Sequence, residues 1–192
     1  TLDRREDFDP LERRIGFSMD HLIGNFYIQE LAAAHPVSIL ADWKIHNDPF
    51  LILDMASSPG WKTTQLAEYF PGSFIIANEP TRERIPQLLQ NLDRMGSASI
   101  GVTLYPGQYW KKFPETFDRI LLDAPCSWEG TLYKWTDAAK HWHIKNIKNI
   151  ASLQTKLFDS AIHALKVWGE MIYSTCSMND LEDEWVLENI SK

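Results

Sequence analysis

The sequence predicts a doubly wound α/β domain built on a parallel β-sheet. Short apolar runs bounded by turn residues alternate with longer segments of helical spacing, an order that favours parallel strands joined by right-handed helical crossovers. The chain has 192 residues, 44% of them apolar and 23% charged, which is enough for one domain with a substantial core.

Five buried strands are expected where the apolar runs lie between turn residues, at residues 50–53, 73–77, 99–104, 117–122 and 170–174. Helical spacing predicts helices over residues 62–69, 81–95, 144–166 and 180–189. Ligands of such folds sit beyond the carboxyl ends of the strands, so that edge is where a functional site is expected.

Residues 1–49 are predicted to form an N-terminal cap segment, and residues 50–192 a catalytic domain. The cap opens with a charged stretch and continues with a helix from about residue 21 to residue 35, which Pro36 ends because proline lacks an N–H donor. The chain opens on Thr1 and stops at Lys192 soon after an amphipathic run, so we interpret it as a fragment truncated at both ends.

Composition argues against several classes of protein. No run approaches the roughly 20 apolar residues that span a bilayer, and no signal-peptide pattern is present, so we expect a cytoplasmic protein without a membrane partner. The two cysteines form neither a CxxC motif nor a Cys/His cluster, which argues against a disulfide scaffold and against a metal site. A net charge of −7 means that nucleic-acid binding would need a local basic patch or basic parts outside this chain. We expect a monomer.

The two cysteines each follow an apolar strand, Cys126 in Leu121-Leu122-Asp123-Ala124-Pro125-Cys126 and Cys176 in Met171-Ile172-Tyr173-Ser174-Thr175-Cys176. Neighbouring strands lie about 4.8 Å apart, so both thiols are expected to face one substrate. The alternative for either thiol alone is a small buried hydrophobe. Two thiols at corresponding strand ends make that alternative the weaker one.

The ends of the first two predicted strands offer polar groups and backbone to a ligand. The small-residue loop from Asp54 to Thr64 lets a ligand approach backbone amides and a helix N-terminus, although it is neither a Walker loop nor a GxGxxG motif. Glu79, after the second strand, suits hydrogen bonds to ribose hydroxyls. It equally suits a charge at the start of the next helix, and both interpretations remain open.

Five motifs follow one another along the chain: Gly24-Asn25-Phe26-Tyr27-Ile28-Gln29-Glu30, Pro59-Gly60-Trp61-Lys62-Thr63, Asp123-Ala124-Pro125-Cys126-Ser127 with Glu129-Gly130, Leu153-Gln154, and Ser174-Thr175-Cys176-Ser177. In this order they resemble the Nop/Sun group of S-adenosylmethionine-dependent RNA cytosine carbon-5 methyltransferases, and the first motif resembles the bacterial RsmF-type ribosomal RNA enzymes most. The resemblance covers about residues 14–190. It implies a Rossmann-like class I methyltransferase domain without its last strands, S-adenosyl-L-methionine as cofactor, and RNA as partner, ribosomal RNA first and tRNA as an alternative.

The resemblance also implies residue roles. Carbon-5 of cytosine is a poor nucleophile until a thiolate adds to carbon-6. Cys176 would be that nucleophile, Cys126 would assist product release, and Asp123 would hydrogen-bond the cytosine ring. The cofactor would contact Glu79 through its ribose, Asp123 near its methionine end, and the loop residues Ala56, Ser57, Ser58, Pro59, Gly60, Trp61 and Lys62.

Two departures from the family pattern concern this site. Pro106 stands where the family usually has an acid near the adenine, and proline offers neither a carboxylate nor an amide donor, so Gln108 would have to substitute. Trp61, Trp128 and Trp168 stand where the family usually has glycine or a small residue, in loops expected around one crevice. Either these are UGA codons that the source cell reads as glycine, or the chain is a degenerate RNA-binding module with weak or no turnover.

Charged residues after the first cysteine form two groups. The basic stripe of Lys134, Lys140, Lys145, Lys148 and Lys156, with His141 and His143, either holds RNA phosphates or is a solvated helix face. The acidic residues Asp180, Glu182, Asp183 and Glu184 are expected as charges that favour the start of the last helix.

Overall fold

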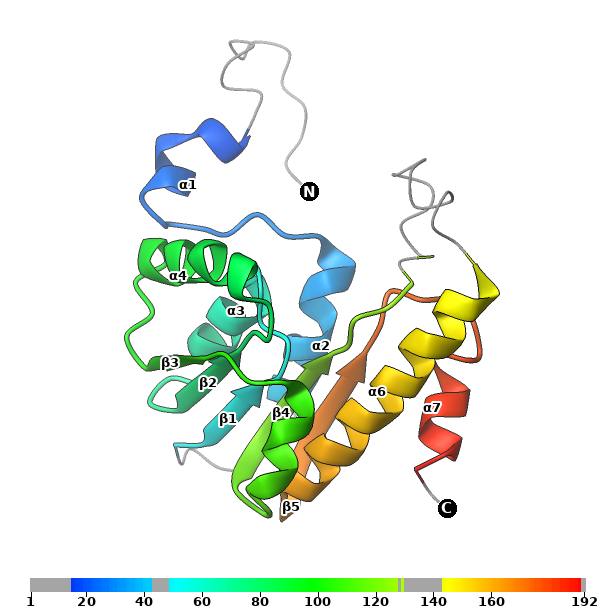
Figure 1. Cartoon of the computed structure of the whole chain (residues 1–192). Helices are drawn as coiled ribbons and strands as arrows, with labels where there is room; N and C mark the ends of the chain where they lie inside the picture. The colour runs from blue at the N-terminus through cyan, green and yellow to red at the C-terminus, as the bar shows by residue number, and fades with distance from the viewer. Residues whose placement is uncertain (1–14, 43–48, 128, 130–142, 191–192) are drawn as a thin grey trace.

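The sheet has the predicted parallel, doubly wound topology. The computed structural model describes residues 15–42, 49–127, 129 and 143–190, and within these ranges the strand order is β3-β2-β1-β4-β5, with every neighbouring pair parallel (Figure 1). The strands are β1 (Leu51–Asp54), β2 (Phe74–Asn78), β3 (Ile100–Thr103), β4 (Phe117–Asp123) and β5 (Leu165–Ser174). All five strands predicted from the apolar runs are confirmed.

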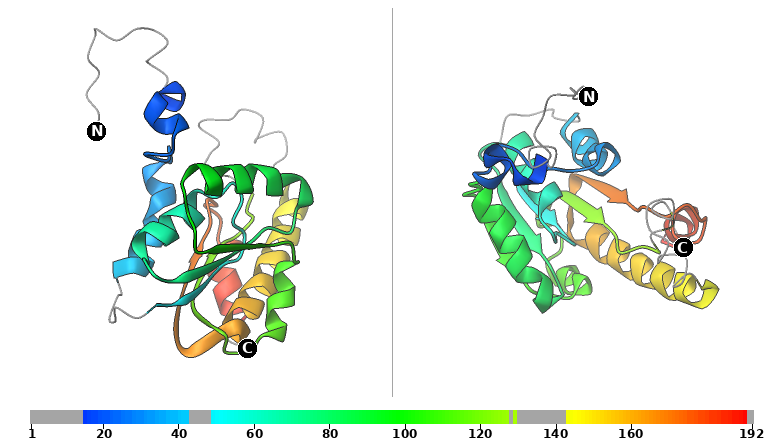
Figure 2. Two further views of the ribbon diagram at one scale, coloured as in Figure 1. Left: turned by 90° about the vertical axis from the view of Figure 1, so that its left-hand side faces the viewer. Right: turned by 90° about the horizontal axis from the view of Figure 1, so that it is seen from above.

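Helices cover both faces of the sheet (Figure 2). One face carries α2 (Leu31–Asp42), α3 (Trp61–Tyr69) and α4 (Ile85–Arg94), and the other carries the 3₁₀ helix η3 (Gly107–Lys112) and α6 (Ile144–Ala164). Side chains alternate between the faces with the strand period of two. In β4, for example, Leu121 packs toward α2 and α3, whereas Ile120 and Leu122 pack against Leu157 and Ala161 of α6.

The predicted helix over residues 21–35 is wrong. A short helix, α1 (Met19–Leu22), ends before Gly24, which has a φ of +85° and lies so close to the carbonyl oxygen of Arg94 that a Cβ would collide with it. The next helix, α2, begins at Leu31 and runs through Pro36. Proline removes one helical hydrogen bond, but the complete burial of Val37 and Leu40 against β1 and α3 stabilises the helix beyond it.

Other boundaries differ by a few residues. The segment predicted as a helix from residue 81 begins with the 3₁₀ helix η2 (Arg82–Arg84), and the last helix, α7 (Glu184–Glu188), starts four residues later than predicted. The first turn of the chain's described part is the 3₁₀ helix η1 (Ile15–Phe17). Strand β5 starts at Leu165, and its register against β4 shifts between Phe117 and Arg119, so residues 166–169 bulge from the ladder.

The segment predicted as a cap shares the core of the sheet domain, because Val37, Leu40 and Ala41 pack with Ile52 and Leu121. The domain boundary at residue 49 stays a prediction. The four arginines of the charged lead-in, Arg4, Arg5, Arg13 and Arg14, lie outside the described residues. No helix in the described ranges is long and apolar enough to cross a membrane.

Candidate active site

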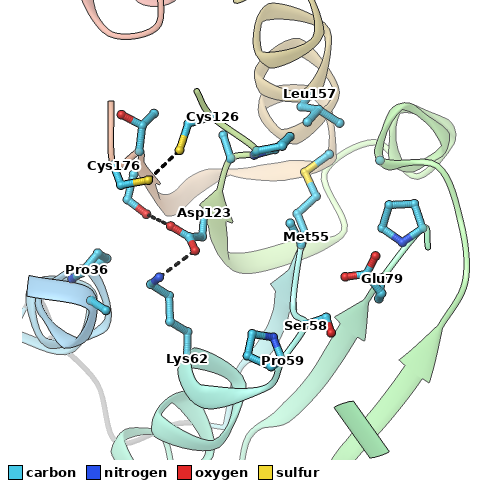
Figure 3. A pocket seen from close by; sticks show the side chains of 18 of the residues that line it. Pro36, Met55, Ser58, Pro59, Lys62, Glu79, Asp123, Cys126, Leu157 and Cys176 are labelled. Carbon is cyan, nitrogen blue, oxygen red and sulfur yellow. Dashed lines mark hydrogen bonds and ion pairs between the residues drawn. The ribbon is translucent and has the colours of Figure 1, made fainter. Parts of the chain in front are cut away.

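A cavity of about 980 Å³ opens at the carboxyl ends of the strands, which is the edge predicted for a ligand. Its wall combines the loop after β1, the residues that follow β2, β4 and β5, and the side of α2 around Pro36 (Figure 3). The volume lies within the range of small-molecule and cofactor sites. Cys126 and Cys176 line one end, and Glu79 and Pro106 line another part of the wall.

The two thiols lie side by side, as the sequence predicts. The Sγ atoms of Cys126 and Cys176 are 2.8 Å apart, because β4 and β5 are neighbours paired in register up to Asp123 and Ser174. Cys176 is exposed and Cys126 is buried. The hydrogen bond from Cys126 is the main reason why the pKa of the Cys176 thiol lies below its usual value, and this effect outweighs the opposing effect of partial burial. Cys176 is therefore both the more accessible thiol and one whose pKa is lowered.

Asp123 is held in a fixed orientation beside the thiols. Its Oδ2 accepts a hydrogen bond from Lys62 Nζ at 2.7 Å, and its Oδ1 accepts one from Ser174 Oγ at 2.8 Å. The Lys62 side chain is only 7% exposed, so this is a largely buried ion pair on the cavity wall. Lys62, which we predicted as a cofactor-loop residue, thus also positions the Asp123 carboxylate.

The cofactor loop is shaped by backbone contacts as well as by side chains. Ala56, Ser58, Pro59, Trp61 and Lys62 line the cavity, and the Ser58-Pro59 peptide bond is cis. The other two predicted residues do not line the cavity. Ser57 ties the loop to β2, since its N–H and its hydroxyl both donate to the carbonyl of Asn78. Gly60 caps α3 with a φ of +110°, a conformation that favours glycine.

Glu79 lies both at the start of the next helix and on the cavity wall, and its contact with a ribose stays a prediction. Its side chain is buried and lines the cavity, and its Oε1 accepts a hydrogen bond from the N–H of Thr81, just before η2. Its Oε2 lies 3.3 Å from Arg84 Nη1 and has no hydrogen-bond partner within the described part of the chain. Pro106 and Gln108 line the same cavity.

Sequence reasoning missed Asp54, the last residue of β1. Its side chain is 1% exposed and accepts a hydrogen bond from Thr63 Oγ1 at 2.6 Å. Burial raises the pKa of Asp54 from 3.8 to about 7, and the hydrogen bond from Thr63 opposes this rise. Its place between an apolar strand and a small-residue loop was the available signal, because an acid there cannot avoid burial.

A second missed residue is Glu182, whose predicted role as a helix-start charge is wrong. Its side chain is fully buried, and its carboxylate accepts hydrogen bonds from the Cys126 and Cys176 loops rather than facing the solvent at the helix end. Asp183 stands at the N-cap of α7 and accepts a hydrogen bond from Thr175 Oγ1, and Glu184 lies in the first turn. A charged residue in a short polar segment gives the same sequence signal whether it faces the core or the solvent.

The predicted basic stripe is described only in part. Lys145, Lys148 and Lys156 are exposed on α6 and do not line the cavity. His143 is the N-cap of α6, where its Nδ1 accepts a hydrogen bond from the N–H of Lys145 at 3.3 Å. Lys134, Lys140 and His141 lie outside the described residues. Contact of this stripe with RNA stays a prediction.

The prediction that three tryptophans surround one crevice is wrong for Trp168. This residue is 93% exposed and lies in the bulge near the start of β5, at the amino edge of the sheet, away from the cavity. Trp61 lines the cavity, with Lys62 Nζ 5.3 Å from its ring centroid. Trp128 lies outside the described residues.

No group of three or more potential metal ligands from histidine, cysteine, aspartate and glutamate is found among residues 15–42, 49–127, 129 and 143–190.

Comparison with known proteins identifies the family. Curated relatives named "Ribosomal RNA small subunit methyltransferase F" include one from Aliivibrio fischeri, 41% identical over 92% of this chain, and one from Cronobacter sakazakii, 42% identical over 95%. The chain spans 37% and 38% of the lengths of these relatives.

Solved structures support the same assignment and confirm the Rossmann-like methyltransferase fold. A methyltransferase homologue from Pyrococcus horikoshii has a TM-score of 0.79 and 30% identity over 95% of this chain and 55% of its own. NSun6 from the same organism, crystallised with SFG, has a TM-score of 0.81 and 26% identity over 92% of this chain and 44% of its own. The family model for the 16S rRNA methyltransferase RsmB/F matches residues 42–192, and the chain belongs to that family.

Proposed function

We propose that the protein containing this chain methylates carbon-5 of a cytosine in RNA, ribosomal RNA first, with S-adenosyl-L-methionine as methyl donor. The observation that carries the proposal is the pair of thiols 2.8 Å apart at the cavity, with Asp123 beside them. Relatives that share about two-fifths of their residues with this chain are named as ribosomal RNA methyltransferases. Cytoplasmic location and a monomeric state stay predictions.

The residues of the cavity fit the methyl donor. The Oε2 of Glu79 is buried on the cavity wall, and its contact in the described chain is the ion pair with Arg84 at 3.3 Å, so the oxygen can still accept a hydrogen bond from a ribose hydroxyl. Pro106 and Gln108 would flank the adenine, Ala56 and Pro59 would contact the cofactor through the loop, and Asp123 would lie near the methionine end. When bound, S-adenosyl-L-methionine supplies the electrophilic methyl group that carbon-5 takes up.

The first step attributed to the chain itself is addition. The Cys176 thiolate forms a bond to carbon-6 of the cytosine, and electron density from the 5,6 double bond becomes available at carbon-5. The lowered pKa of Cys176 favours this step, because the thiolate and not the thiol is the nucleophile. Asp123, fixed by Lys62 and Ser174, would hydrogen-bond the ring at nitrogen-3 and the amino group, offsetting charge as the adduct forms.

The second step is release. Once Cys126 has lost its own proton to water, its sulfur can accept the proton that leaves carbon-5. The electrons of that C–H bond restore the 5,6 double bond, the bond from carbon-6 to sulfur breaks, and Cys176 leaves as a thiolate. The 2.8 Å contact between the sulfurs places Cys126 next to the Cys176 sulfur that is bonded to carbon-6 in the adduct.

Substitution of each cysteine in the full-length protein tests the proposal. Cys176→Ser should abolish methylation and covalent attachment, because a hydroxyl is scarcely ionised at neutral pH. Cys126→Ser should accumulate an RNA–protein adduct that survives denaturing electrophoresis and requires both the methyl donor and Cys176. Unpaired RNA should react faster than duplex, since the target base must leave its stack.

Two outcomes would contradict this assignment. An adduct trapped by Cys176→Ser but not by Cys126→Ser would exchange the roles of the cysteines. No adduct with either variant, in a protein that binds S-adenosyl-L-methionine, would favour the degenerate RNA-binding module.

A further inference from the structure

A buried carboxylate connects the two loops that carry the cysteines. The Glu182 side chain is fully buried, and its Oε2 accepts hydrogen bonds from the N–H of Ser127 at 2.9 Å and from Gln154 Nε2 at 3.0 Å. Its Oε1 accepts a hydrogen bond from Asn179 Nδ2 at 2.9 Å. Ser127 directly follows Cys126, and Asn179 lies three residues after Cys176. One carboxylate therefore bridges both loops.

Further contacts fix the same arrangement from both sides of Cys126. Gln154 Nε2 also donates to the carbonyl of Pro125 at 2.9 Å, so the residues before and after Cys126 are both bound to the Glu182–Gln154 pair. Asn179 Nδ2 also lies 2.9 Å from Glu129 Oε2, which brings a second carboxylate from the Cys126 side onto the Cys176 loop. The carbonyl of Glu182 itself accepts a hydrogen bond from Tyr173 of β5 at 2.8 Å.

The contacts of Glu182 indicate a role in the site rather than in the helix that follows it. A carboxylate has only acceptors, and burying one is costly unless several donors satisfy it. The donors to this carboxylate come from the Cys126 loop, from α6 and from the Cys176 loop. A residue that served only to start α7 would have no need of them.

We infer that Glu182 is a positioning residue that holds Cys126 against Cys176, and so sets the distance on which product release depends. The part of this inference that concerns product release rests on the proposed function. The geometric part, the approach of one sulfur to the other, does not depend on RNA.

A change of Glu182 has two effects of opposite sign on Cys176. The groups that act on the Cys176 thiol are Cys126, Asp123 with its partner Lys62, and Glu182 itself. The negative charge of Glu182 raises the pKa of Cys176, so its loss alone would lower that pKa. Loss of the hydrogen bond from Cys126, the largest cause of the low pKa, would raise it. The direction in which the pKa of Cys176 changes therefore distinguishes loss of the position of Cys126 (pKa raised) from loss of the Glu182 charge alone (pKa lowered).

The experiment uses Glu182→Gln in the full-length protein, with Glu184→Gln as a matched control that removes an exposed acid of the same segment. Glutamine puts an amide N–H₂ where a carboxylate oxygen met a donor, so at least one of the bridging bonds is lost. Alkylation of Cys176 by iodoacetamide is followed against pH, with the Cys176 peptide quantified by mass spectrometry. Glu182→Gln should shift the midpoint upward and slow alkylation at pH 7 at least about threefold, as Cys126→Ala should, because less thiolate is present once the hydrogen bond to Cys176 is lost. Glu184→Gln should leave the profile unchanged.

A downward shift of the midpoint in folded Glu182→Gln would overturn the inference, and if the midpoint is unchanged, Gln154→Met decides, because it leaves the charge of Glu182 in place. If that variant does not fold, Gln154→Met offers a second route, since it removes the links to Pro125 and Glu182 from α6 while keeping an unbranched side chain of similar length. It should shift the midpoint in the same upward direction, and no shift would again overturn the inference.

A second measurement separates this inference from the proposed function. If both hold, Glu182→Gln should accumulate the same RNA adduct as Cys126→Ser, and combining the two substitutions should add nothing further. An upward shift of the alkylation midpoint without any adduct in Cys126→Ser would support the positioning role and refute the covalent mechanism.

Discussion

Replacing the buried acid of β1, Asp54→Asn, should remove a pH-dependent loss of stability. Burial raises the pKa of Asp54 from 3.8 to about 7, so the folded protein binds this proton more tightly than the unfolded chain. The stabilisation that this proton gives the folded protein is complete below about pH 4 and is lost as the pH rises through 7. A shift of about three units, at about 1.4 kcal/mol each, sets an upper value of about 4 kcal/mol.

The measurement is urea unfolding of wild type and Asp54→Asn from pH 4 to pH 8, without cofactor. Asparagine has nearly the same shape and can still accept the hydrogen bond from Thr63, so other titrating groups cancel in the comparison. The free energy of unfolding of the variant minus that of wild type should rise with pH by up to about 4 kcal/mol. Thr63→Val should extend the fall in stability to higher pH than in wild type, because the hydrogen bond from Thr63 lowers the pKa of Asp54. A difference that is flat across this pH range would refute the reasoning and mean that Lys62 keeps Asp54 ionised.

Two further predictions concern the cofactor cavity. Pro106→Asp should tighten binding of S-adenosyl-L-methionine by about 1 to 2 kcal/mol, roughly five- to thirtyfold in Kd by calorimetry, if an acid at this position reaches the adenine. Pro106→Asn controls for the charge, and an unchanged affinity in both variants would mean that the adenine is held elsewhere. Trp61→Ala should also tighten cofactor binding, because it removes a bulky ring from the cavity wall, whereas Trp168→Gly should leave the affinity unchanged, because Trp168 lies at the opposite edge of the sheet. Equal effects of the two tryptophan substitutions would contradict this distinction.

The sequence was sufficient for the strands and for the meeting of the cysteines. Buried parallel strands appear as continuous apolar runs, and parallel strands present their carboxyl ends at one edge, so the approach of Cys126 to Cys176 followed from topology alone. The helix through Pro36 was not predictable in this way, because the burial of Val37 and Leu40 that stabilises it depends on contacts far along the chain. The buried position of Glu182 was not predictable for the same reason, since its hydrogen-bond donors come from residues up to 55 positions away.

The environments of the two thiols favour the division of labour that we propose. A nucleophile must reach its substrate and be ionised at neutral pH, and Cys176 is exposed and has a lowered pKa. A group that accepts a proton from carbon-5, next to the carbon-6 that is bonded to Cys176, needs a fixed position more than it needs solvent access. Cys126 is buried, and the residues on either side of it are hydrogen-bonded to Gln154 and Glu182. If the roles were exchanged, the buried and restrained Cys126 would have to reach carbon-6 of the base, although Cys176 is the more accessible thiol. The packing around Cys126 therefore argues for Cys176 as the nucleophile.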